Sequence, residues 1–269
     1  MEQAQDSAQL ANREPVREPA REPAQEPTTW WSKAILVGAV IALVMLPVAA
    51  LGYRMHIWSL GGAFMLMGGA VVLSLFGVFG GVIGIVIALR RQLTSDKPVL
   101  YIGTLICALI LAYAGMQFNT ARSVPPIHDI STDVSDPPEF EKIIQLRGDQ
   151  SNSLDYDAST LAPLQAQAYP WVTTLEVGFT AEESFDRALN VLRSMGLEIV
   201  NEDPDRGIIE AVDTSFWFGF KDDLVVRIRA TGYGSKVDVR SVSRVGESDL
   251  GKNAQRIGKF LEAFEAAPA

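Results

Sequence analysis

The sequence predicts an α+β protein in which three amino-terminal transmembrane helices precede a two-layer soluble domain, a mostly antiparallel sheet with two helices on one face. Three uncharged apolar runs between residues 34 and 116 are each near or above the length that crosses a bilayer. Residues 122–269 contain 15 Lys and Arg against 25 Asp and Glu, a net charge of −10. In this acidic part, strand-like and helix-like patterns alternate in the order strand, helix, several strands, helix.

The first segment, residues 1–29, carries the four-residue repeat REPVREPAREPAQEP, which runs from Arg13 to Pro27. Proline at every fourth position prevents a regular helix, and the segment offers almost no apolar surface to bury. We expect a disordered, partly extended tail, with a docking strip for a partner as the alternative.

The predicted membrane region covers residues 30–118 and opens with the interfacial aromatic pair Trp30-Trp31. The expected spans cover about residues 34–51, 60–89 and 98–116. The middle run is uncharged for the 32 residues from 58 to 89. It therefore forms either one overlong helix or two short spans joined at the glycines around Gly80 and Gly81.

The placement of positive charge favours three spans. With three spans, Lys33 and the basic loop of Arg90, Arg91 and Lys97 share one side, and a loop containing only Arg54 lies opposite. Because positively charged short loops stay in the cytoplasm, the amino terminus is predicted inside and the carboxyl-terminal domain outside. No charged residue lies within any expected span, so we predict an anchor rather than a transporter.

Small residues form a strip along the middle span, at Gly77, Gly81 and Gly84 among others. In a helix such a strip lets another helix approach closely. Packing among the chain's own three spans is one interpretation, and formation of a homo-oligomer is the other.

The soluble part divides into a Pro- and Asp-rich extended segment, residues 119–169, and an α+β sandwich, residues 170–267. Within the first segment, a short helix that begins at Pro138 is expected to bury Phe140, Ile143 and Ile144. Thr180 and Glu183 predict a capping box in front of a helix that ends at Gly196. A second helix is predicted at residues 253–266, where apolar residues recur at helical spacing.

A β-hairpin is predicted where LVVRIRAT and KVDVRSVSR flank the turn residues GYGS. The expected register pairs Thr231 with Lys236, which places Arg229 opposite Asp238. One face of this hairpin is then apolar and belongs to the core, and the other face is charged.

An aromatic run, DTSFWFGFKDD at residues 213–223, raises a question of placement. In an extended chain Phe216, Phe218 and Phe220 share one face and Trp217 lies on the other. We expect a hairpin with the phenylalanines in the core and Trp217 as the most exposed ring. A ligand, partner or bilayer contact is the alternative, although a net charge of −10 disfavours anionic lipid headgroups.

Three long motifs carry a resemblance to a known family: PPIHDISTDVSDPPEF, GIIEAVDTSFWFGFKDDLVVRIR and VDVRSVSRVGESDLGKNAQRI. Over about residues 124–263 the chain resembles the bacterial and plant domain-of-unknown-function family 1499. The preceding membrane spans are similar to the arrangement in many bacterial members. The resemblance implies a domain identity but no reaction.

Two groups of residues are candidate sites. His128, Asp129 and Asp133 combine imidazole with carboxylates, as a divalent metal site does, but Asp in such a loop also serves turns. The second group would bind an anion or a partner on the sheet face; a solvated face with neighbouring acids is the alternative. Its members are Trp217, Arg227, Arg240 and Arg244.

Composition and the absence of motifs argue against several classes of function. The net charge of −9 argues against a nucleic-acid partner, and no phosphate-binding loop or nucleophile elbow is present. We therefore predict, without a cofactor, a non-enzymatic binding or adaptor module in the bacterial cytoplasmic membrane, with an envelope protein as partner. The alternatives are a metal-dependent hydrolase that uses His128, Asp129 and Asp133, and a carrier of a small apolar or lipid-like ligand.

Overall fold

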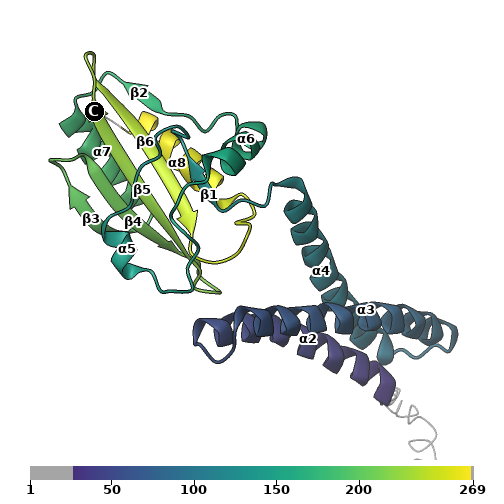
Figure 1. Ribbon diagram of the computed structural model, residues 1–269. Helices are drawn as coiled ribbons and strands as arrows, with labels where there is room; N and C mark the ends of the chain where they lie inside the picture. Colours follow the sequence, from purple (N-terminus) through teal and green to yellow (C-terminus); the bar gives the residue numbers. More distant parts are fainter. Residues whose placement is uncertain (1–26, 268–269) are drawn as a thin grey trace, which may run out of the picture.

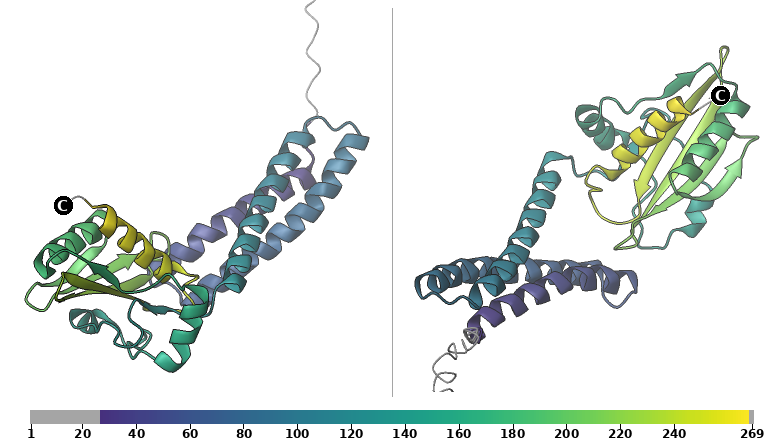
Figure 2. Two further views of the ribbon diagram at one scale, coloured as in Figure 1. Left: turned by 90° about the horizontal axis from the view of Figure 1, so that it is seen from above. Right: turned by 180° about the vertical axis from the view of Figure 1, so that it is seen from behind.

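The computed structural model describes residues 27–267, so the predicted tail lies almost wholly outside the described residues. Three helices follow one another: α2 (Trp30–Arg54), α3 (Leu60–Arg90) and α4 (Asp96–Ser123). All three are long and apolar enough to cross a membrane. The uncharged run at residues 58–89 forms the single helix α3, whose 31 residues reach about 47 Å at 1.5 Å per residue. The three helices lie side by side as a bundle (Figure 2).

The glycine strip of α3 faces the chain's own helices. A Cβ at Gly77 would lie 2.4 Å from Sγ of Cys107, and one at Gly81 would lie 2.0 Å from Oγ1 of Thr104, both on α4. These distances are shorter than any Cβ contact, so only glycine allows α3 and α4 to pack this closely. At Gly84 a Cβ would meet Trp31 and Leu100. The strip that the sequence offers to a second copy is therefore occupied within the chain.

The rest of the chain folds into an antiparallel sheet with helices (Figure 1). The sheet order is β1-β6-β5-β4-β3, and β2 also pairs with β6. The strands are β1 (Asp129–Ser131), β2 (Leu175–Val177), β3 (Glu198–Asp203), β4 (Ile208–Thr214), β5 (Lys221–Ala230) and β6 (Ser235–Ser243). The helices are α5 (Lys142–Leu146), α6 (Ala158–Ala168), α7 (Ala181–Ser194) and α8 (Lys252–Ala266). The predicted α+β class with a mostly antiparallel sheet is confirmed.

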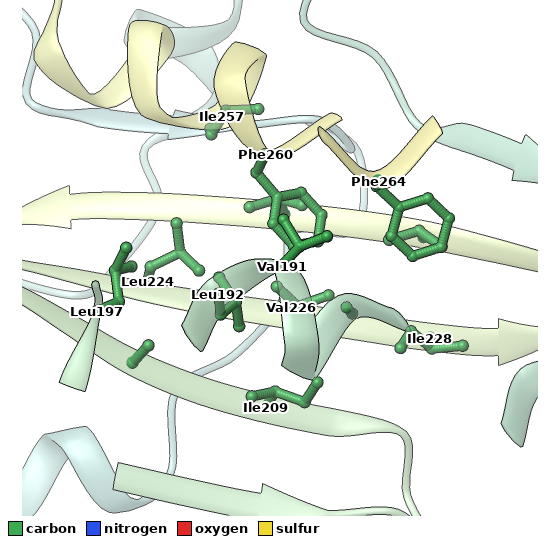
Figure 3. Close-up of a cluster of buried hydrophobic side chains, with 14 of the residues drawn as sticks. Val191, Leu192, Leu197, Ile209, Leu224, Val226, Ile228, Ile257, Phe260 and Phe264 are labelled. Carbon is green, nitrogen blue, oxygen red and sulfur yellow. The ribbon is translucent and has the colours of Figure 1, made fainter. Parts of the chain in front are cut away.

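Helices α7 and α8 lie on one face of this sheet, as the apolar spacing predicts (Figure 2). The capping box of Thr180 and Glu183 is present at the start of α7. Fully buried side chains from both helices meet those of the central strands (Figure 3). They include Leu192, Ile209, Leu224, Val226, Ile257, Phe260 and Phe264.

The opposite face is covered by residues 132–157, which link β1 to α6 and are called the cover segment. Phe140 and Ile143 of this segment pack on Val225 and Val242 of the central strands. The predicted burial of Phe140 and Ile143 beside a short helix is confirmed, whereas Ile144 is exposed and the helix begins at Lys142. Because the cover hides most of the polar face of β5 and β6, Asp223, Asp238 and Arg240 lie buried between two layers of protein, whereas Arg229 stays partly open to solvent.

The β5–β6 hairpin forms, but its register differs from the predicted one by two residues. Ser235 belongs to β6 and pairs with Ala230, so Arg229 lies opposite Lys236. The hydroxyl of Ser235 is buried and lies 2.7 Å from the hydroxyl of Ser184 on α7. Ser235 is therefore both paired in the sheet and in contact with α7. Since the slip is even, every side chain keeps its predicted face.

Candidate functional site

The basic residues of the polar sheet face are engaged in ion pairs. Asp238 is fully buried, and its Oδ2 accepts hydrogen bonds from Arg227 at 3.1 Å and Arg229 at 3.0 Å. Arg229 also donates to Asp136 at 2.7 Å. The hydrogen bond from Arg229, together with the charge of Arg227, lowers the pKa of Asp136. This cluster is a closed network rather than a free cationic strip.

Arg240 is the most deeply buried of the predicted binding residues, with 3% of its side chain exposed. It forms a bidentate pair with Asp129, with Nε–Oδ1 and Nη2–Oδ2 distances of 3.0 and 2.7 Å. It also donates to the carbonyl of Leu154 in the cover segment, at 2.6 Å. Burial raises the pKa of the neighbouring Tyr156 phenol to about 12, and the charge of Asp129 adds to the shift. Arg240 thus fastens the cover segment to the sheet.

Arg244 shares the buried carboxylate of Asp223 with Arg147. Its Nη2 lies 2.7 Å from Oδ1 of Asp223, and its Nη1 donates to the carbonyl of Leu146 at 2.8 Å. Two guanidinium groups compensate one buried carboxylate, and both also hold the backbone of the cover segment.

Glu210 makes a buried contact with the start of α5 that was not predicted from the sequence. It is fully buried on β4, and its carboxylate accepts the backbone N–H groups of Glu141, Lys142 and Ile143 at 2.7, 2.8 and 3.4 Å. These are the unpaired donors at the start of α5, so a strand side chain caps a helix from a distant part of the chain. A lone Glu inside an apolar strand pattern is the only sequence signal of it.

The predicted metal residues are not brought together. Asp129 is paired with Arg240, and Oδ1 of Asp133 accepts the backbone N–H groups of Ser135 and Asp136. Nδ1 of His128 lies 3.3 Å from a backbone carbonyl. His128 and Asp129 line a shallow pocket of 240 Å³ to which Asp133 does not contribute. Across residues 27–267, no group of three His, Cys, Asp or Glu side chains could hold a metal ion.

The aromatic run does not extend the hairpin, and the expected row of core phenylalanines is wrong. Strand β4 ends at Thr214 and β5 begins at Lys221, so residues 215–220 form the turn between them. Phe216 is 77% exposed and Trp217 is 55% exposed, with their rings edge to face at 5.3 Å. Trp217 is exposed as predicted, but Phe216, which was expected in the core, is the more exposed of the two rings.

The phenylalanines at the end of this turn pack on the membrane helices instead. Phe218 and Phe220 stack at 4.8 Å, and both lie against Tyr53 near the end of α2, at 6.1 and 5.4 Å. The Arg54 guanidinium donates a hydrogen bond to the carbonyl of Phe216. The turn reaches the connection between α2 and α3 (Figure 1). Alternation could not reveal this contact because the partner surface is more than 150 residues away.

A cleft of 390 Å³ opens along this seam between the helical bundle and the domain. Four basic side chains line it, and no lining residue is acidic: Arg54, His56, Lys221 and Arg244. Arg244 is held by Asp223, whereas Lys221 and His56 are exposed and carry no ion pair within the described residues. Beside a domain with a net charge of −10, a cleft whose ionisable lining side chains include basic groups and no acidic ones is a local exception.

These features define a class: an α+β domain attached to a bundle of three membrane-compatible helices. The chain belongs to the family described as "Protein of unknown function (DUF1499)", whose model matches residues 129–264. The resemblance predicted from the sequence motifs is confirmed. No curated protein matches the chain.

Proposed function

We propose that this protein is a non-enzymatic binding module anchored in the bacterial cytoplasmic membrane. In this proposal α2, α3 and α4 cross the bilayer, the amino terminus is cytoplasmic, and the family domain faces the envelope. The distribution of Lys33, Arg90, Arg91 and Lys97 supports this orientation, since they gather at one end of the bundle.

The observation that carries the proposal is the basic lining of the seam cleft. The arginines of the sheet face are bound to carboxylates, whereas Lys221 and His56 remain open to solvent at the seam. The ligand that fits is an acidic group of an envelope component that approaches close to the membrane surface, where Arg54 adds to the attraction.

A photoreactive amino acid at Gln150, an exposed residue of the cleft, tests the proposal in intact membranes. We expect a defined adduct that disappears with Lys221→Glu, while the same probe at the exposed Glu262 of α8 gives none. Equal labelling from both positions, or an adduct that survives the charge reversal, would contradict the proposal.

The orientation has its own test. A reporter that is active only outside the cytoplasm, fused after the last residue, is expected to be active. Activity of a cytoplasm-only reporter at the same position would overturn the compartment. The metal-dependent hydrolase and the apolar carrier gain no supporting observation from the described residues.

A further inference from the structure

The β4–β5 turn presents two large apolar rings to solvent in a fixed conformation. The N–H of Ser215 donates to the carbonyl of Phe220 at 2.8 Å, and the N–H of Phe220 returns to the Ser215 hydroxyl at 2.9 Å. Gly219 adopts a φ of +67°, which a side chain would strain. The turn therefore holds Phe216 and Trp217 outward instead of letting them collapse onto the domain.

The position of this turn relative to the membrane helices is set by direct contacts. Arg54 is the last residue of α2 and donates to the carbonyl of Phe216. A Cβ at Gly219 would lie 3.1 Å from Cγ of Arg54, so the turn at Gly219 packs directly against the Arg54 side chain. An arginine at the end of an apolar span lies at the interface between hydrocarbon and headgroups. The exposed rings are therefore at the level of that interface.

The neighbouring surface has the composition of a membrane-interface belt. In the α2–α3 connection Met55 is 68% exposed and Ile57 is 64% exposed, and both continue the apolar surface of α2. Aromatic rings are favoured in this zone because they combine apolar area with a polar edge, as the Trp217 indole does.

The domain's acidity does not oppose this contact locally. The two carboxylates nearest the turn on β4 and β5, Asp213 and Asp222, are both bound by Arg256, at 2.7 and 2.6 Å. Lys221, at the end of the turn, remains exposed and positively charged. The negative charge that repels a bilayer is thus compensated at this end of the sheet.

We propose that the β4–β5 turn is a membrane-docking tip: Phe216 and Trp217 insert into the headgroup region beside α2, and Arg54 holds the turn in place. The family domain is then fixed against the bilayer at one end instead of moving freely on the α4 connection. The docking tip rests on the membrane anchoring proposed above, because α2 must cross the bilayer, but it does not depend on the ligand of the cleft.

The test uses the full chain with Cys107→Ser and one new cysteine, labelled with an environment-sensitive fluorophore, in phosphatidylcholine vesicles. Trp217→Cys reports on the tip. The matched control is Tyr233→Cys, because Tyr233 is 97% exposed in the turn at the other end of β5. We expect a blue-shifted emission at 217 and several-fold stronger quenching by lipids with a nitroxide near the headgroup, with neither effect at 233.

A second pair of variants tests the role of Arg54. Arg54→Gln is expected to reduce the quenching at 217, whereas Arg90→Gln, at the end of α3, leaves it unchanged. A water-like emission at 217, or equal quenching at 217 and 233, would overturn the docking tip. A blue shift without quenching by lipid would assign the surface to a protein partner or a second copy and would also overturn it.

The unmodified protein gives an independent measurement without a label. Brominated lipids quench tryptophan fluorescence at short range, so the full chain is expected to lose more emission than the Trp217→Phe variant does. Identical losses would count against insertion of the tip.

Discussion

The two faces of the central sheet are built from the same strands but are covered through different interactions, apolar packing on one face and ion pairs on the other. Toward α7 and α8, apolar side chains such as Leu224 and Val226 meet Phe260 and Phe264 in a dry core. Toward the cover segment, the alternate residues of β5 include Asp223 and Arg227, which are held in ion pairs and hydrogen bonds. The first face depends on area and shape, and the second on each charge having its partner.

The two faces should therefore differ in how much stability a substitution costs. An apolar core loses stability in proportion to the volume removed, so a conservative replacement costs little. In a buried network of ion pairs the loss of stability does not scale with the volume removed, because removal of one partner leaves another charge uncompensated.

Phe260→Ala is expected to have the largest effect. Phe260 is fully buried between α8 and the sheet (Figure 3), and truncation of such a ring costs about 3–5 kcal/mol. Urea unfolding of the full chain in detergent, followed by tryptophan fluorescence, to which Trp171 beside α8 contributes, measures it. Phe260→Leu, which keeps most of the volume, should cost clearly less; equal losses would show that the core does not respond to volume.

Asp223→Asn tests the opposite face. Loss of this charge leaves Arg147 and Arg244 without their carboxylate, and we expect a loss of about 3 kcal/mol, the low end for breaking a buried pair. The matched control is the exposed pair of Arg193 and Glu202, at 2.7 Å. Glu202→Gln should cost less than about 1 kcal/mol. Similar losses for the two variants would remove the distinction between buried and exposed pairs.

Glu210→Gln is expected to weaken the cover segment selectively. The neutral amide accepts from the N–H groups of Glu141 and Lys142 less strongly than the carboxylate, at a cost of about 1–2 kcal/mol. Hydrogen exchange should accelerate at residues 141–143 while amides of α8 stay protected. Uniform acceleration in both places would mean that the cover and the helical layer unfold as one unit.

The smallest effect is the pH dependence contributed by Asp136. Its pKa in the folded protein lies below the ordinary 3.8, so ionised Asp136 stabilises the fold above that pH. This contribution is lost as the pH falls through the lowered folded-state pKa. Asp136→Asn should therefore make stability less dependent on pH below about 4, a range set by the same linkage. Asp149→Asn, an exposed aspartate outside the network, should leave the acid limb of the urea profile unchanged.

Sequence reasoning reached the elements whose signals are local. The capping box of Thr180 and Glu183 is contained within four residues, and the uncharged run of α3 needs only its length. The prediction of which hairpin side chains share a face was also correct, because side chains alternate with a period of two and a register shift of two residues leaves their faces unchanged. The hairpin's register was predicted wrongly, because the pattern placed Ser235 in the turn, whereas Ser235 pairs with Ala230 in the strand and contacts Ser184 of α7.

The aromatic run shows the limit of pattern. Alternation gives the relative faces of Phe216 and Phe218 only if the chain is extended, and here it turns. Whether a ring belongs to a core or to a surface depends on what lies beside it. For Phe218 that neighbour is Tyr53 of the membrane region, which no periodicity within the domain can indicate.

The three apolar helices, the α+β order and the acidic character of the domain could all be predicted from the sequence. Each of these follows from composition or spacing within a short stretch of chain. Only the tertiary structure decided which charge meets which: Asp129 pairs with Arg240, which lies 111 residues away, and Arg54 with a carbonyl 162 residues away. A charged residue looks the same in a sequence whether it is solvated or paired, because its partner is chosen by the fold.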